Sequence, residues 1–204
     1  MRTVIQISDL HFGTILEPTI EPLVRHISAL APDLVITSGD LTQRARRDQF
    51  TDAKNFLARL PEPQMVIPGN HDVPAYNLWR RLMEPLDRYK KMITPDLCPT
   101  FFDDEIAVVA LNSARALVIK GGSLSEKQVN WAVEQFEKRS SSDQVRIVVA
   151  HHPFDIPPRL QGVDIIGGAE YAIHRFAQCG VDLFLGGHLH LVYVSSTARY
   201  KVPG

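Results

Sequence analysis

The stretch "VIQISDLHFG", residues 4–13, changes character halfway along. It begins as an apolar run typical of a buried β-strand, then reaches Asp9, and His11 follows two residues later. Along an extended chain, residues i and i+2 point to the same side, about 6 to 7 Å apart. On this reading Asp9 and His11 face one point while Leu10 faces the core. The stretch therefore predicts a core strand that ends in two potential metal ligands.

The length and composition of the chain indicate one globular domain. Its 204 residues suit a single domain, 1–204, with a substantial core. A content of 45% hydrophobic and 22% charged residues is ordinary for such a protein. No apolar run approaches the roughly 18 to 20 residues that span a bilayer. We therefore expect no membrane association.

Charge and cysteine content narrow the functional classes further. A formal net charge of −1 argues against a dedicated nucleic-acid-binding protein. The two cysteines are too few for a disulfide framework, and Met1-Arg2 leads straight into strand-like sequence without a signal peptide. We therefore predict a cytoplasmic protein. The basic cluster Arg44, Arg46 and Arg47 is expected at a solvated helix start, with contact to an anionic substrate as the alternative.

Short apolar runs alternate with amphipathic stretches along the chain, which predicts an α/β layered fold. The predicted strands are 3–8, 34–38, 64–67, 106–111, 145–150 and 182–185. The predicted helices are 19–30, 47–60, 76–92, 125–139 and 169–179. The helix 125–139 is best supported, because Ser125 and Gln128 form a capping-box pattern. The final stretch 191–200 alternates and predicts a strand with one exposed face.

Polar residues follow almost every predicted strand. The blocks are Asp9-Leu10-His11, Gly39-Asp40, Gly69-Asn70-His71-Asp72, His151-His152 and Gly187-His188-Leu189-His190. In open α/β sheets the carboxyl ends of the strands form the ligand crevice, so these blocks are expected to converge. Their carboxylates, amide and imidazoles are too many ligands for one tetrahedral ion, and structural zinc sites favour cysteine. Mixed oxygen and nitrogen ligands suit two divalent ions such as Mn, Fe, Zn, Co or Ni sharing a carboxylate.

Each block alone has a simpler interpretation. An Asp-x-His sequence is most often a surface turn, and Gly-Asp is a common turn dipeptide. The "GNHD" block, 69–72, could be a loop with Asn70 in a left-handed conformation. The occurrence of all five blocks at successive strand ends favours the metal centre.

With these blocks in this order, the chain resembles the calcineurin-like metallophosphoesterases, whose signature is D-x-H, G-D, G-N-H-D/E, H and G-H-x-H. The opening "ISDLHFG" resembles the bacterial class III cyclic-nucleotide phosphodiesterase branch. The resemblance implies a four-layer αββα sandwich with two metal ions. Relatives usually continue past G-H-x-H with strands that complete the second sheet, whereas this chain ends fourteen residues after His190. We therefore expect a domain short at its C-terminus and lacking closing strands, unless a partner chain in a homo-oligomer supplies them.

The resemblance also implies which residues hold the ions. One ion would take Asp9, His11 and His190, the other would take Asn70, His151 and His188, and Asp40 would bridge them. In related enzymes the fourth block reads H-x-P with the first position coordinating, so His151 is chosen over His152. The centre would hold two divalent ions, each of which is Mn, Fe or Zn.

The expected activity is hydrolysis of a small phosphate ester, either a cyclic-nucleotide-like diester or a monoester, by a metal-bridging hydroxide. His71 is the predicted general acid, and Asp72 is predicted to orient its imidazole. Side chains expected to line the substrate crevice are His152, Phe154, Arg44 and Arg159. Two alternatives stay open: a non-catalytic protein-interaction module on the same fold, and a nuclease, although the charge balance offers no extended basic groove.

Overall fold

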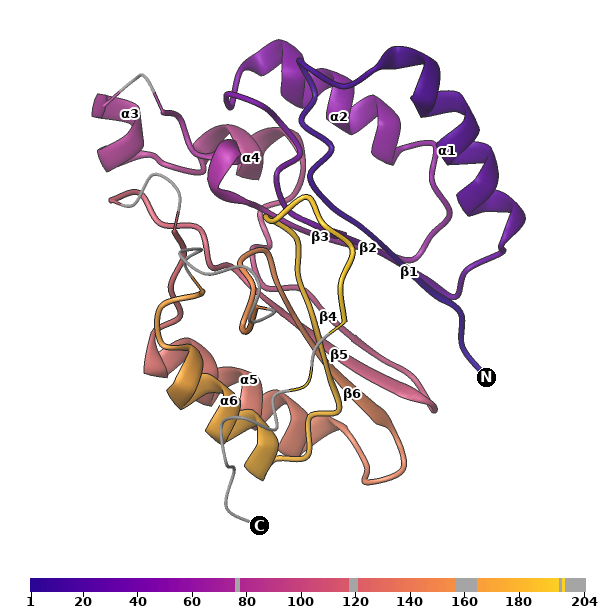
Figure 1. Cartoon of the computed structure of the whole chain (residues 1–204), viewed down its shortest axis with the longest axis vertical. Helices are drawn as coiled ribbons and strands as arrows, with labels where there is room; N and C mark the ends of the chain where they lie inside the picture. Colours follow the sequence, from indigo (N-terminus) through magenta and orange to yellow (C-terminus); the bar gives the residue numbers. More distant parts are fainter. Residues whose placement is uncertain (76–77, 118–120, 157–164, 195, 197–204) are drawn as a thin grey trace.

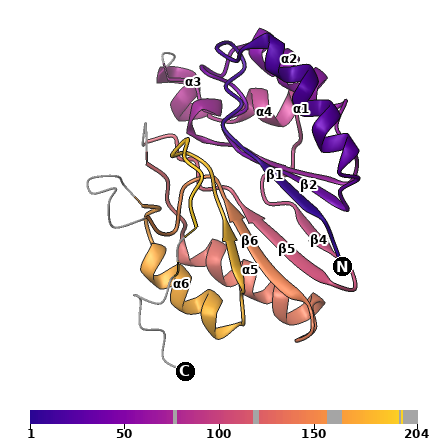
Figure 2. The same cartoon turned by 45° about the vertical axis from the view of Figure 1, so that its right-hand side comes forward.

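Two β-sheets lie face to face between two layers of helices (Figures 1 and 2). The computed structural model describes all residues except 76–77, 118–120, 157–164, 195 and 197–204. The first sheet is parallel and contains β1 (Val4–Ile7), β2 (Leu34–Ser38) and β3 (Gln64–Ile67), in that order. The second sheet has the order β4 (Thr100–Phe102), β5 (Ile106–Leu111), β6 (Val145–Ala150) and β7 (Leu183–Leu185). Only β4 is antiparallel to its neighbour among these strands.

The helices cover the outer face of each sheet. On the first sheet lie α1 (Glu17–Ala29) and α2 (Arg47–Leu57), and α4 (Asp87–Met92) packs against α2. On the second sheet lie α5 (Glu126–Arg139) and α6 (Ala169–Gln178). A short helix, α3 (Leu78–Met83), and a 3-10 turn, η1 (Asn70–Asp72), follow β3. No helix among the described residues has the length and apolar character needed to cross a membrane.

Residues on alternate sides of the strands belong to different cores. In β2, Leu34 and Ile36 pack between the two sheets, while Val35 packs against the outer helices. In β6, Val149 likewise faces the first sheet and Val148 faces α5 and α6. Strands buried on both faces read as continuous apolar runs, which is how they were identified in the sequence. The three separate cores show the predicted four-layer αββα sandwich.

The boundaries of β2, β3, β5 and β6 match the predicted ones. The predicted capping box of α5 is also confirmed: Ser125 Oγ accepts the Gln128 N–H at 3.3 Å, and Gln128 Oε1 accepts the Ser125 N–H at 3.2 Å. Because Ser125 is the N-cap, α5 begins one residue later than predicted.

Three predictions of secondary structure need correction. The predicted helix 76–92 is interrupted at Pro85, which has no N–H to donate and disfavours helical geometry in the residue before it. Strand β4 was missed because it has only three residues and lies beside a proline-bearing loop. Within the predicted strand 191–200, residues 191–194 and 196 form no strand, and the others lie outside the described residues.

The inter-sheet core should dominate the stability of the domain. Ile36 is 1% exposed between the sheets, so Ile36→Ala should lower the free energy of unfolding by about 2 to 5 kcal/mol. Leu117→Ala removes the same number of carbon atoms from a side chain that is 83% exposed, and should change stability by less than about 0.5 kcal/mol. Urea unfolding followed by circular dichroism measures both. Equal losses in the two variants would contradict this account of the core.

Candidate metal centre

The first group of potential ligands is formed by Asp9, His11 and His190, which we call the first donor group. The Nε2 atoms of His11 and His190 are 3.0 Å apart. Asp9 Oδ1 lies 3.4 Å from His190 Nε2 and 3.9 Å from His11 Nε2. Two imidazole nitrogens at this separation need a shared proton or a shared cation between them. The arrangement therefore fits a cation at this point.

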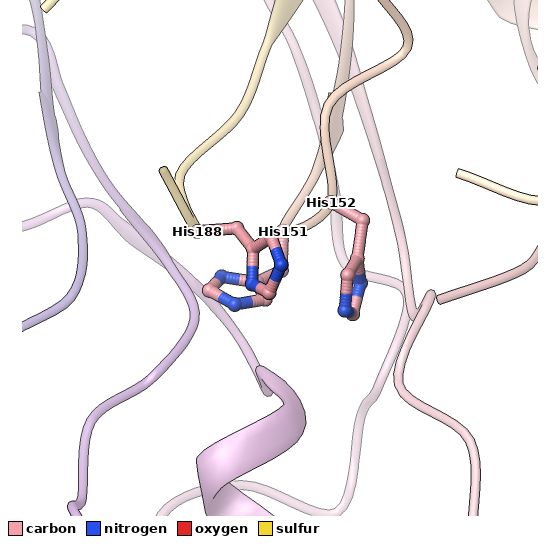
Figure 3. Close-up of side chains that lie close together, drawn as sticks. All are labelled: His151, His152 and His188. Atoms are coloured by element: carbon pink, nitrogen blue, oxygen red, sulfur yellow. The ribbon is translucent and has the colours of Figure 1, made fainter. Parts of the chain in front are cut away.

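The second donor group is formed by Asn70, His151 and His188. His151 Nε2 lies 3.2 Å from Asn70 Oδ1, and the ring centroids of His151 and His188 are 5.3 Å apart. The two rings are nearly perpendicular, at 79°, and the His152 ring lies close to both of them (Figure 3). His151 Nδ1 is 2.9 Å from the Ser38 carbonyl, which only accepts, so Nδ1 carries a hydrogen. This bond turns Nε2 toward the other donors, as is usual for a metal-binding histidine.

The Asp40 carboxylate lies between the two donor groups. Its Oδ2 atom is 3.2 Å from His151 Nε2 and 3.9 Å from His11 Nε2. Its Oδ1 atom accepts the backbone N–H of His71 at 2.8 Å, and the side chain is 1% exposed. A buried carboxylate between two sets of nitrogen and oxygen donors fits a pair of divalent ions such as Mn, Fe or Zn.

The geometry that brings these ligands together differs from the predicted strand alternation. Strand β1 ends at Ile7 and β7 at Leu185, before the ligands begin. The φ angles of Asp9, His11, His188 and His190 are all positive, between 48° and 72°. Each left-handed residue costs about 1 to 2 kcal/mol. The prediction that an extended chain presents the D-x-H and H-x-H ligands is therefore wrong: tight left-handed turns present them.

Hydrogen bonds between loops hold these turns in place. The N–H groups of Asp9 and His11 donate to the carbonyls of Gly39 and Asp40 at 3.1 and 3.0 Å. The N–H of His188 donates to both carboxylate oxygens of Asp9, at 3.1 and 3.0 Å. Strain at a site persists only where the surroundings over-determine it. The ligands are therefore preorganised by the loops that follow β1, β2 and β7.

Burial and charge set the protonation states of the centre. Burial disfavours the His151 imidazolium, but the Asp40 carboxylate outweighs it and raises the pKa of His151 to about 9. Burial likewise opposes the Asp40 charge, yet His151 lowers the pKa of Asp40 to about 2. Burial lowers the pKa of His11, which keeps that imidazole neutral. Without a cation, the centre is thus held together by a buried ion pair that a cation can replace.

The predicted partnership between His71 and Asp72 is not present. His71 Nδ1 donates to the Gln43 carbonyl at 2.9 Å. The fully buried Asp72 carboxylate instead accepts the backbone N–H groups of Thr42 at 2.9 Å and Gly69 at 2.9 Å. Burial, together with the nearby Asp40 charge, raises the pKa of Asp72 to about 6. Asp72 therefore ties the loop after β2 to the loop after β3, and Gln43 orients His71.

The residues predicted to line a substrate crevice are distributed differently. His152 is buried beside the second donor group, whereas the ring of Phe154 packs against Phe176 and Phe184 in the outer core. Arg44 is exposed on the loop before α2, and Arg159 lies outside the described residues. Ser113, which forms a hydrogen bond with His152, was not predicted as a site residue. The available signal was the polar pair Asn112-Ser113 directly after β5, a strand end that carries none of the five blocks.

Two adjacent glycines provide a matched test of this packing. A Cβ atom on Gly187 would lie 2.7 Å from Asp9 Oδ2 and 2.8 Å from Ser8 Cβ, so Gly187→Ala should displace the Asp9 carboxylate. At Gly186 the nearest atom is a carbonyl oxygen at 3.4 Å, an ordinary contact. We expect Gly187→Ala to weaken divalent-metal binding about tenfold or more, as loss of ligand orientation does elsewhere, and Gly186→Ala to retain it. Calorimetric titration of chelator-treated protein measures both, and equal affinities would contradict the assignment.

Two curated proteins similar to this chain act on phosphodiesters by name. A probable glycerophosphodiester phosphodiesterase of Arcobacter nitrofigilis is 32% identical over 164 residues, which cover 74% of this chain and 56% of that protein. A probable cyclic nucleotide phosphodiesterase of Synechococcus is 27% identical over 207 residues, 94% of this chain and 74% of that protein. The chain thus spans about half of the first relative and three quarters of the second.

Solved structures share the sandwich. A purple acid phosphatase from yellow lupin has a TM-score of 0.68 at 15% identity, covering 92% of this chain and 37% of that one. A dimetal phosphatase from Danio rerio has a TM-score of 0.66 at 15% identity, covering 93% of this chain and 82% of that one. These likenesses concern the fold alone. The sequence model of the calcineurin-like phosphoesterases, in contrast, matches residues 2–192. The chain therefore belongs to the calcineurin-like phosphoesterase family.

Proposed function

We propose that this chain is a dinuclear-metal phosphoesterase that hydrolyses a small phosphodiester of the cyclic-nucleotide or glycerophosphodiester type, with phosphomonoesters as further substrates. The observation that carries this proposal is the position of Asp40. Its Oδ2 atom lies within 3.9 Å of a ligand nitrogen in each donor group. The names of the two relatives described above support the diester, and the formal charge of −1 offers no excess of positive charge for a long nucleic acid.

The proposed ligands follow from the two donor groups. Asp9, His11 and His190 would hold one divalent ion, Asn70, His151 and His188 the other, and Asp40 would contact both. Bound divalent ions would supply a water-derived nucleophile at neutral pH and positive charge opposite the phosphate oxygens. Asp40 and His151 are almost fully buried, while His190 is open to solvent. A substrate would therefore reach the ions from the side of His190.

His71 is the proposed general acid for the leaving group. Its ring is half-buried and meets the His11 ring edge-on, with centroids 4.7 Å apart. The bond from Nδ1 to the Gln43 carbonyl fixes the ring and directs Nε2 away from that carbonyl. When the bond from phosphorus to the leaving oxygen breaks, a proton on Nε2 would pass to that oxygen. Asp72 has a different role in this proposal: it holds together the two loops that carry Asp40 and His71.

Metal analysis combined with hydrolysis assays tests the proposed function. Purified protein is freed of metal, loaded with Mn, Fe, Zn or Co, and assayed with bis(p-nitrophenyl) phosphate, p-nitrophenyl phosphate, cyclic AMP and glycerophosphodiesters. We expect two ions per chain and faster turnover of diesters than of the monoester. Two bound ions with no turnover of any ester would instead favour a non-catalytic binding module.

A single substitution separates proton donation from metal binding. His71→Ala should lower kcat about 10²- to 10⁴-fold, the usual contribution of a general acid, while two ions stay bound. His26→Ala on α1 changes an exposed histidine and should leave kcat unchanged. Steady-state kinetics and metal content by mass spectrometry are measured on the same samples. Loss of an ion together with activity would make His71 a ligand and remove it as the general acid.

A further inference from the structure

The second histidine of the His151-His152 pair is buried beside the metal centre. His152 is 1% exposed, and its ring centroid lies 4.7 Å from that of His188 and 4.9 Å from that of His151 (Figure 3). One ring nitrogen of each of these three histidines lies within 4.8 Å of the others. By position alone, His152 could therefore bind a cation or a substrate. The hydrogen bond at His152 Nδ1 bears on the choice between these roles.

That hydrogen bond is made with Ser113, which follows β5. Ser113 Oγ lies 2.8 Å from His152 Nδ1 and also accepts the His152 backbone N–H at 3.3 Å. Ser113 is fully buried, so its hydroxyl hydrogen needs an acceptor within the protein. Within the described part of the chain, His152 Nδ1 is the one acceptor in contact with it. The hydroxyl therefore donates to Nδ1, and the proton of the neutral imidazole is on Nε2.

The neighbouring His151 has the opposite arrangement. Its Nδ1 faces the Ser38 carbonyl, which cannot donate, so Nδ1 carries the hydrogen and Nε2 can offer a lone pair to a cation. One histidine of the pair is thus bonded to a carbonyl and the other to a hydroxyl donor. Once a cation replaces the proton on His151 Nε2, the two side chains have opposite tautomers: His151 offers its Nε2 lone pair, and His152 carries its hydrogen on Nε2.

The orientation of the His152 ring is fixed by close packing. A Cβ atom on Gly122 would lie 2.1 Å from His152 Nδ1 and 2.4 Å from Cγ, so the ring lies directly against the glycine backbone. Backbone hydrogen bonds hold this glycine in place. The Gly167 N–H donates to the Gly122 carbonyl at 2.8 Å, and the Ser123 N–H donates to the Ser113 carbonyl at 3.0 Å. The Ser113 hydroxyl and the Gly122 backbone thus both contact the ring at its Nδ1 atom.

We propose that Ser113 is a positioning residue that fixes His152 as the Nε2–H tautomer, so that His152 donates a hydrogen bond to a phosphate oxygen rather than binding a metal ion. The inference rests on the proposed function, because the phosphate is that of its substrate or product. It also accounts for two adjacent histidines with different partners at one strand end.

Nitrogen chemical shifts test the tautomer directly. In zinc-loaded protein labelled with ¹⁵N-histidine, the His152 resonances are assigned by their absence in His152→Gln. We expect a hydrogen on Nε2 and a bare Nδ1. A hydrogen on Nδ1, or Nε2 bound to zinc, would overturn the proposal. This measurement does not depend on turnover, so it stays decisive even if no ester is hydrolysed.

Phosphate binding tests the consequence of the tautomer. Loss of a hydrogen bond to a charged group typically weakens binding about tenfold or more, so Ser113→Ala should raise the Kd for inorganic phosphate by about that factor. The KM of the diester should rise similarly, with kcat and the content of two ions unchanged. Ser113→Thr keeps the hydroxyl and should restore both, and Ser142→Ala on an exposed loop is the matched control. Unchanged phosphate affinity in Ser113→Ala, or failure of Ser113→Thr to restore it, would contradict the positioning role.

Discussion

The buried charge of Asp40 is the constraint on which the rest of the centre depends. A carboxylate that is 1% exposed is costly unless charges and hydrogen bonds compensate it. Here the compensation comes from His151, directly after β6 of the second sheet, and from the backbone N–H of His71 after β3. The same two contacts bring elements of both sheets to one carboxylate. The requirement to satisfy Asp40 therefore assembles the surroundings that two cations would occupy.

The packing between the sheets sets how closely these partners approach. The bond from His151 Nδ1 to the Ser38 carbonyl crosses from the second sheet to the first. A Cβ atom on Gly39 would lie 2.6 Å from the same imidazole nitrogen, so the backbone and the ring are in direct contact. The apolar layer formed by residues such as Ile36 and Val149 fixes this spacing. The packing of the inter-sheet core therefore also sets the positions of the ligands at this edge of the sandwich.

A layered α/β fold and the convergence of the loops could be predicted from short-range patterns and from the shared direction of parallel strands, whereas the four-layer arrangement was implied by the family resemblance. The sequence did not predict how the ligands are presented. The left-handed turns at Asp9 and His188 depend on hydrogen bonds to loops far away in the chain, and no local pattern records them. For the same reason Asp72 was assigned to its sequence neighbour His71, although two of its partners, Leu41 and Thr42, are 31 and 30 positions away. Ser113 was passed over because its contact with His152 spans 39 positions.

The first donor group also has a topological consequence. His11 and His190 are separated by 179 positions, yet their Nε2 atoms are 3.0 Å apart. An ion held between them would act as a cross-link that closes nearly the entire chain into one loop. An ion that binds the folded state alone adds stability by mass action, and here it would do so by joining the two ends of the fold. Metal occupancy would then report on the integrity of both sheets at once, because opening either of them separates the two ends of the link.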